Sequence, residues 1–327
     1  MKKSLLITFL SAFLLPVFLS GQLFWNPPET STSYSGDGGD GAFLNANWWD
    51  GNENVTFANS DDLVFEGQGN ISGANDGERP GNLNFRNLTG NYSLTTGNDL
   101  FSNTGNVTME VTSGSYNVFI QSMRSGSPEI TNNSDGLLTF GRIRRATGSA
   151  PNGSLNGTGD IEIGGTFGTH NNIQFNSTGR MILSGSFDAH IILNAGELYR
   201  TDDRNSRSLT WNGGVIIADL DEGLGQANTI NLGGAFTSGS GTDFVFDFEG
   251  FNATTQGSYT LVTFDSSDFD VSDFSAINIT YDSGLSGQFD LTGSTLDFTV
   301  IPEPSTYAAI LGLGALGLMI WRRRRLK

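Results

Sequence analysis

Short runs in which apolar and polar residues alternate constrain the fold of this chain more than any other feature. One example is the segment from Val107 to Val111, where Val107, Met109 and Val111 are separated by Thr108 and Glu110. A period of two puts successive side chains on opposite faces of a strand, so that one face is buried and the other meets water. Between residues 22 and 300 no apolar stripe has the period of a helix. The sequence therefore predicts an all-β fold for residues 22–300.

The runs recur from residue 63 to residue 217, at irregular intervals, and are separated by turn-forming clusters of Gly, Asn, Asp and Ser. They contain the following apolar pairs and triplets: Leu63 to Phe65, Leu83 and Phe85, Val118 and Ile120, Leu138 and Phe140, Ile161 and Ile163, Ile173 and Phe175, Met181 to Leu183, Ile191 to Leu193, and Val215 to Ile217. Short rungs joined by polar turns are typical of a β-solenoid, in which each coil stacks on the last. Residues 61–217 are therefore predicted to form a solenoid-like region.

The segment from Ser208 to Val215 reads Ser-Leu-Thr-Trp-Asn-Gly-Gly-Val. It resembles the Leu-Thr-Trp-x-Gly-Gly pattern of autotransporter-type passenger strands. That resemblance implies a right-handed parallel β-helix.

The segments on either side of the solenoid-like region differ from it. Residues 22–60 contain Trp25, Phe43, Trp48 and Trp49 and are predicted to form an N-terminal cap. Residues 218–300 contain longer alternating runs and a predicted closing hairpin that turns through Thr292, Gly293 and Ser294. This section is expected to be a C-terminal β cap or a small antiparallel module. Its runs are Phe244 to Phe248, Tyr259 to Phe264, Ile277 to Tyr281, Phe289 to Leu291 and Leu296 to Val300.

Both ends of the chain read as targeting segments. Residues 1–21 have a basic start, an apolar stretch and a small-residue exit, which is the order of a secretory signal peptide. Near the other end, residues 306–321 are uncharged, and as a helix they would be roughly 24 Å long. Tyr307 and Trp321 bracket this stretch as interface anchors, and Arg322, Arg323, Arg324 and Arg325 follow at once. The sequence predicts a transmembrane helix over 306–321 with a basic cytoplasmic end at 322–327.

Just before the apolar stretch stand Pro302, Glu303 and Pro304. A proline-framed acid, an apolar segment and an arginine cluster in this order resemble the PEP-CTERM sorting domain, which would occupy 301–327. The resemblance implies a Gram-negative-type bacterium and an exosortase as partner. It further implies a precursor anchored in the inner membrane, which is then processed near the motif and delivered to the cell surface or the extracellular matrix. The alternative is a plain C-terminal membrane anchor of unrelated type.

Composition excludes several classes of function. The chain has no cysteine, so disulfides, thiolate metal sites and cysteine nucleophiles are ruled out. Between the targeting ends, 33 acidic residues stand against ten arginines, which gives a net charge near −23. Such a surface repels nucleic acid, and it favours solubility outside a cell and a loose attraction for divalent cations.

Candidate chemical groups are few, and each has a structural alternative. His170 and His190, with Asp188 and Glu162, would suit a metal pair or a general base if neighbouring coils brought them together. The alternative places His170 in a turn and His190 at a strand edge. The acids Asp61 and Asp62, and likewise Asp219, Asp221 and Glu222, would suit a polysaccharide lyase or a glycosidase, whereas solvated turn acids are the alternative.

Two further groups concern ligands. Arg142, Arg144 and Arg145 would bind an acidic sugar or would simply be exposed residues at strand ends. Asp37 to Gly41 offers carboxylates and carbonyls to calcium without the spacing of a known calcium loop. We expect no catalytic residue, no metal and no cofactor, with calcium as the alternative.

The sequence thus predicts a non-enzymatic structural or adhesive protein of the cell surface or the extracellular polymer matrix, with extracellular polysaccharide as a partner. A secreted β-helix enzyme acting on carbohydrate is the main alternative, and a calcium-dependent adhesin is another.

Overall fold

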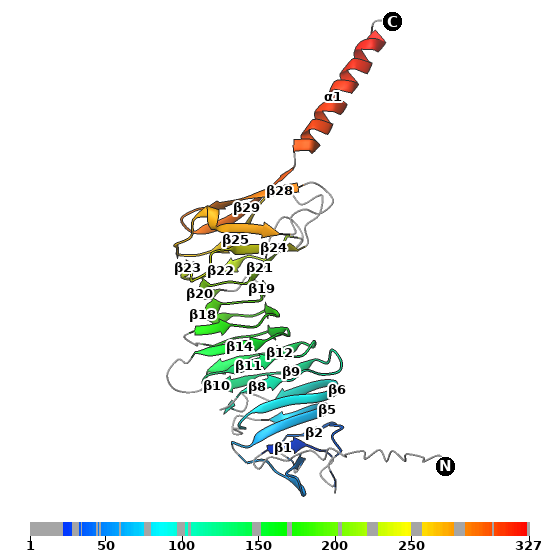
Figure 1. Ribbon diagram of the computed structural model, residues 1–327, viewed down its shortest axis with the longest axis vertical. Coiled ribbons are helices and arrows are strands. Elements are labelled where there is room, and N and C mark those ends of the chain that lie inside the picture. The colour runs from blue at the N-terminus through cyan, green and yellow to red at the C-terminus, as the bar shows by residue number, and fades with distance from the viewer. Residues whose placement is uncertain are drawn as a thin grey trace, which may run out of the picture.

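The computed structural model describes residues 22–325, except 28–32, 34, 44, 46, 59, 75–79, 97–101, 104–105, 146–151, 169–171, 202–204, 221–227, 250–256, 278–284 and 303. The predicted signal peptide, 1–21, lies outside the described residues, as does His170. The strands stack one above another along a single long axis, from β1 at one end to β29 at the other (Figure 1).

Nearly all strand pairing along this axis is parallel, and the pairs fall into three columns, which we call the first, second and third faces. The first face contains the N-terminal parts of β5 (Asp62–Ala74) and β6 (Leu83–Thr96), followed by β8 (Val107–Met109), β11 (Glu129–Asn132), β14 (Gly153–Gly157), β16 (Asn172–Phe175), β18 (Phe187–Leu193), β20 (Ser206–Trp211), β23 (Ala235–Thr237) and β26 (Ser266–Ser267).

The second face begins with the C-terminal parts of β5 and β6. It continues with β9 (Val118–Ile120), β12 (Leu138–Phe140), β15 (Ile161–Ile163), β17 (Arg180–Leu183), β19 (Glu197–Arg200), β21 (Val215–Asp219), β24 (Phe244–Glu249) and β27 (Phe274–Ile277). The third face is narrower and contains β7 (Ser102–Asn103), β10 (Met123–Ser125) and β13 (Ile143–Arg145), extended by single bridges through Phe167 to Phe187. The chain visits the three faces in turn, so the described strands form a parallel solenoid-like stack. The right-handed turn expected for it stays a prediction.

The alternation of apolar and polar residues decides which side chains of each strand are buried, as the sequence predicted. In β9, β12 and β15 the first and third residues are buried and the middle one faces outward. The inward side chains of all three faces form one continuous apolar core along the axis. Aromatic rings stack within it across neighbouring coils, for example Phe167 on Phe187 with ring centroids 4.5 Å apart.

The coils differ in length, which explains why the alternating runs recur at irregular intervals in the sequence. Met181 pairs with Leu198, 17 positions further on, whereas Ile216 pairs with Phe246, 30 positions further on. The loops absorb this difference, since strand pairing fixes only the residues within the rungs. Loop length costs little free energy, so coils of unequal length can coexist in one stack.

One turn is repeated from coil to coil, and its asparagines form a ladder. The amide of Asn176 donates to Oδ1 of Asn156 at 3.0 Å, Asn194 donates to Asn176 at 2.7 Å, and Asn212 donates to Asn194 at 2.6 Å. Asn176 and Asn194 each donate to the preceding coil and accept from the following one, because an asparagine side chain carries both a donor and an acceptor. We call these four residues the asparagine ladder.

Different strands close the two ends of the stack. At the N-terminal end, β1 (Gln22–Trp25) pairs with β5 and with β3 (Trp48–Trp49), while β2 (Gly41–Ala42) and β4 (Asn54–Val55) complete the cap. At the other end, a four-stranded sheet contains β22 (Ile230–Asn231), β25 (Gly257–Thr263), β28 (Leu285–Leu291) and β29 (Thr295–Pro302). β25, β29 and β28 pair antiparallel, and the β28–β29 hairpin turns through the expected residues.

Several details differ from the predictions. The division expected between 217 and 218 falls inside β21, and the second face continues beyond it to β27. Val111 was expected inside with Val107 and Met109, but β8 ends at Met109 and Val111 is 74% exposed. The run expected to extend from Ile277 to Tyr281 ends its described part at Ile277, because residues 278–284 are not described. One short 3-10 turn, η1 (Val271–Asp273), interrupts the strands.

Candidate functional site

The sequence-predicted sorting motif lies where the β-structure ends and a helix begins. Pro302 is the last residue of β29 and pairs with Leu285 of β28. Pro304 is the first residue of helix α1 (Pro304–Arg325), a position that suits proline because its missing N–H is not needed in the first turn. Glu303, between them, lies outside the described residues. The motif therefore marks the junction between the last β-strand and the C-terminal helix.

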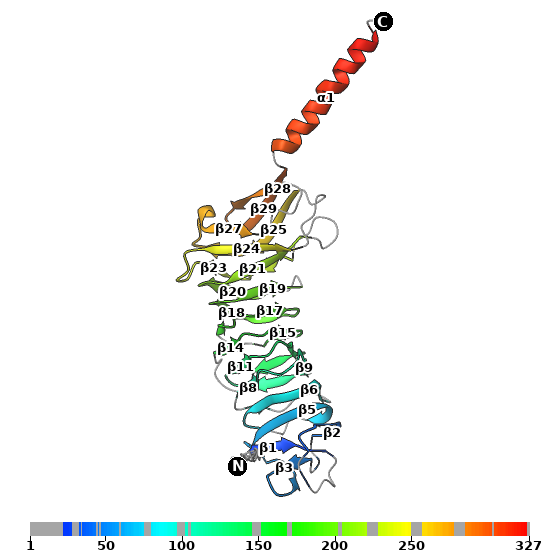
Figure 2. The same ribbon diagram turned by 45° about the vertical axis from the view of Figure 1, so that its right-hand side comes forward.

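Helix α1 leaves the stack at this junction and extends away from it in both views (Figures 1 and 2). Its described apolar side chains are exposed rather than packed on the strands, with Leu311 at 73% and Leu313 at 69%. Leu316, Leu318, Met319, Ile320 and the anchor Trp321 are each at least half exposed. Helix α1 covers the predicted apolar span and Arg322 to Arg325, although the side chains of Tyr307 and Arg323 to Arg325 are not among those described.

The membrane-spanning helix predicted over 306–321 is not supported by the described residues. Among them, no helix combines the length and the apolar character that crossing a membrane requires.

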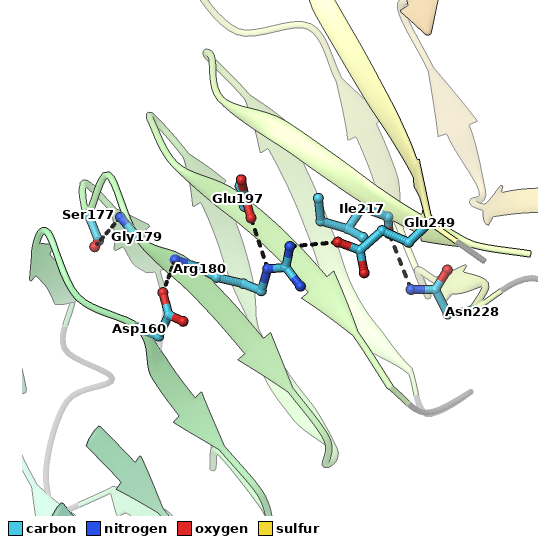
Figure 3. Close-up of polar contacts among 8 residues, drawn as sticks. All are labelled: Asp160, Ser177, Gly179, Arg180, Glu197, Ile217, Asn228 and Glu249. Carbon is cyan, nitrogen blue, oxygen red and sulfur yellow. Dashed lines mark hydrogen bonds and ion pairs between the residues drawn. The ribbon is translucent and has the colours of Figure 1, made fainter. Parts of the chain in front are cut away.

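A polar cluster on the second face links three strands (Figure 3). The guanidinium of Arg180 on β17 donates from Nε to Glu197 on β19 at 2.8 Å and from Nη2 to Glu249 on β24 at 2.7 Å. Its charge also lies 5.5 Å from the centre of the Tyr199 ring. Burial opposes the charged form of Arg180, and the bonds to Glu197 and Glu249 outweigh it and raise the arginine's pKa. This cluster could not be predicted from the sequence, because Arg180 and Glu249 are 69 residues apart.

The same region contains two buried, hydrogen-bonded polar side chains, Asn228 and Arg200, which the sequence analysis did not predict. Asn228 is 5% exposed and donates from Nδ2 to the backbone carbonyls of Arg200 and Ile217, while its Oδ1 accepts from the N–H of Asp219. Arg200, 1% exposed, points into the core and donates to Ser206 Oγ at 2.6 Å. These bonds satisfy backbone groups where the coils lengthen, so both residues have structural roles.

His190 and His170 are not shown to meet, because His170 lies outside the described residues. The ring of His190 lies on the outer side of the first face, with Nδ1 hydrogen-bonded to Ser208 Oγ and Nε2 at 3.0 Å from Thr210 Oγ1. Burial first, and then the charge of Arg207, lower the pKa of His190. Asp188 instead lies 3.3 Å from Arg207, both about half exposed. The described contacts of His190 are thus with two hydroxyls and with no carboxylate.

The carboxylates proposed for catalysis take part in turns and surface bonds. Asp61 Oδ2 accepts from the N–H of Ala58 at 2.6 Å, and Asp62 Oδ1 accepts from both nitrogens of Asn82. Asp219 accepts from the hydroxyl of Tyr199. Of the remaining acids, Glu162 accepts from Thr139 and Ser184, whereas Asp221 and Glu222 lie outside the described residues.

The two predicted ligand groups also have structural partners. Arg142 donates to Ser122 at 2.9 Å, and Arg144 lies in register with Arg124 on the third face. The side chain of Arg145 is not described. In the segment Asp37 to Gly41, Asp40 accepts from the N–H and the amide of Asn70.

Gly38 in the same segment has a φ of +70° and lies against Gln68 and Tyr92. Within the described part of the chain, no three potential metal ligands cluster.

The fold and the tail together define a class: an elongated β-solenoid-like domain with a C-terminal sorting helix. Residues 300–325 match the PEP-CTERM protein-sorting motif, so the chain carries the sorting tail of PEP-CTERM proteins, and this prediction is confirmed. The match covers the end of β29 and α1 and does not extend into the stack. Comparison with curated proteins and with solved structures gives no match. The motif identifies the chain as an exported protein sorted by an exosortase.

Proposed function

We propose that this protein is a structural or adhesive component of the cell surface or the extracellular polymer matrix, without catalytic activity. The observation that carries the proposal is the union of a rigid elongated β-stack with a sorting motif placed directly after its last strand. A protein of this form acts through its position and its surface. Its polar outer faces are available for polysaccharide along the full length of the axis.

The tail has a separate role in the proposal. Its exposed apolar side chains, followed by four arginines, support a precursor held at the inner membrane with its basic end in the cytoplasm. An exosortase then cleaves near Pro302, Glu303 and Pro304. The stack is the part that reaches the cell surface, because it lies wholly on the N-terminal side of the motif.

The test is fractionation of cells that express the full chain with an epitope in the ectodomain. We expect the wild-type product to be shortened and found at the cell surface or in the medium. Glu303→Ala should leave the full-length protein in the inner membrane. The matched control is Asp290→Ala, which removes an exposed acid from the adjacent hairpin and should be processed like the wild type. Normal processing of Glu303→Ala would contradict the sorting role, and a cytosolic, uncut wild-type chain would contradict export.

A further inference from the structure

The three faces of the stack differ in charge on their outer side. The second face presents the acids Glu162, Glu197, Asp219, Asp247 and Glu249, together with one arginine, Arg180, which bonds to two of them. The third face presents Arg124 and Arg144. Between β8 and β23, the first face presents almost only uncharged polar groups. Its outward side chains are Thr108, Thr131, Ser154, Asn156, Asn172, Gln174, His190, Ile192, Ser208, Thr210 and Thr237. The charged exceptions are Glu129 at the start of β11, and Asp188 on β18 and Arg207 on β20, which form an ion pair near the starts of those two strands.

These uncharged groups form columns, because the strands pair in register. Thr108 faces Thr131, which faces Asn156 on the next coil. A second column takes Ser154 to Gln174, and a third takes Asn172 to His190. Neighbouring parallel strands are about 4.8 Å apart, so hydroxyl and amide groups recur along the axis at that interval. The axis is the long dimension of the molecule (Figure 2).

Part of this face is already hydrogen-bonded within the protein, and part is not. Near its C-terminal end, the hydroxyl of Thr210 contacts both His190 Nε2 and, at 2.8 Å, Thr237 Oγ1. Among the described residues, by contrast, the side chains of Thr131, Asn172 and Gln174 make no hydrogen bond, although each is half-buried. A threonine hydroxyl and the two amides can each donate and accept at the same time.

We propose that the first face between β8 and β23 binds an extended, uncharged, hydroxyl-rich polysaccharide that lies along the axis. This inference rests on the proposed surface role and names the face and the ligand class. The net negative charge of the domain favours an uncharged ligand over an acidic one. A domain with 33 acids and ten arginines repels polyanions, whereas a face of hydroxyls and amides offers hydrogen bonds to sugar hydroxyls without desolvating a charge. Repetition over many coils makes many weak contacts act together.

Affinity electrophoresis of the ectodomain-containing protein tests the proposal, with gels that contain a soluble polysaccharide. The neutral probes are hydroxyethyl cellulose, dextran and a soluble β-1,3-glucan, and the acidic probes are alginate and pectate. We expect at least one neutral probe, and neither acidic probe, to retard the wild-type protein. Because the side chains of Thr131, Asn172 and Gln174 make no hydrogen bond with any part of the chain that the structure describes, the triple variant T131A/N172A/Q174A should keep the melting temperature. Its affinity for the neutral probe should fall by about tenfold or more.

The control is S93A, which removes an outward hydroxyl from the second face. It should bind like the wild type. The proposal is overturned if no neutral probe retards the protein, if an acidic probe does so instead, or if the triple variant binds unchanged. Equal loss of binding in the control would also overturn it. The proposed function fails separately, through the fractionation of Glu303→Ala, because correct sorting requires no polysaccharide in the gel.

Discussion

Removal of one amide from the asparagine ladder tests whether the turns stabilise the stack. Asn194→Ala deletes two side-chain hydrogen bonds, one donated to Asn176 at 2.7 Å and one accepted from Asn212 at 2.6 Å. A neutral hydrogen bond contributes about 0.5–1.5 kcal/mol net. Because the bond to Asn176 is solvent-exposed and the one from Asn212 only partly buried, we expect a total loss of about 1–2 kcal/mol in the free energy of unfolding. That corresponds to a fall in melting temperature of roughly 2–8 °C for a domain of this size.

The assay is thermal unfolding followed by circular dichroism, combined with hydrogen exchange of the backbone amides. Each coil of a solenoid contacts mainly its neighbours, so exchange should rise most in β16, β18 and β20, which precede the three asparagines joined by the lost bonds. The matched control is Asn205→Ala, which removes an exposed asparagine outside the ladder. If both variants melt at the same temperature, the ladder does not stabilise the coils and the reasoning fails.

A double substitution tests whether Asn194 and Asn212 stabilise the fold through the hydrogen bond between them. In Asn194→Ala/Asn212→Ala, the bond between the two residues is lost only once. The combined loss of stability should therefore be smaller than the sum of the two single losses. Strict additivity would show that the two amides do not interact in solution.

Three further predictions concern other parts of the stack. The pKa of His190 is lowered below its ordinary 6.5 in the folded state, so the unfolded chain takes up this proton at a higher pH than the folded chain does. The free energy of unfolding should therefore fall as the pH drops below about 6.5. In urea unfolding measured across this pH range, His190→Gln should remove that part of the pH dependence. Arg180→Ala should lower the free energy of unfolding by about 1 kcal/mol at low salt and by less at 1 M salt. Arg207→Ala, which breaks one exposed ion pair, should lower it by less. Equal losses for the two variants in chemical unfolding would show that the two ion pairs of Arg180 add no extra stability. Gly157→Ala should cost several kcal/mol, because φ is +109° and the new Cβ would lie 2.0 Å from the carbonyl oxygen of Asn132, whereas Gly293→Ala, with open space around it, should melt like the wild type.

The asparagine ladder shows why some details escaped sequence reasoning. Asn156, Asn176, Asn194 and Asn212 are separated by 20, 18 and 18 positions, and many other asparagines occur between and around them. Only the stacking of coils reveals that these four are neighbours. The same holds for Arg180 and Glu249, which meet because β17, β19, β21 and β24 pair in succession.

The sequence by itself determined the class of fold and the sorting tail. Alternation with a period of two is a local property, and it dictates which side of each rung is buried before any partner is known. The order of proline motif, apolar segment and arginines is likewise local and is read directly along the chain. Tertiary structure alone decided the lengths of the coils, the continuation of the second face through β21 to β27 and the largely uncharged character of the first face. Those features depend on pairing between residues 17 to 31 positions apart, and loops of variable length hide that pairing because they cost the fold little free energy.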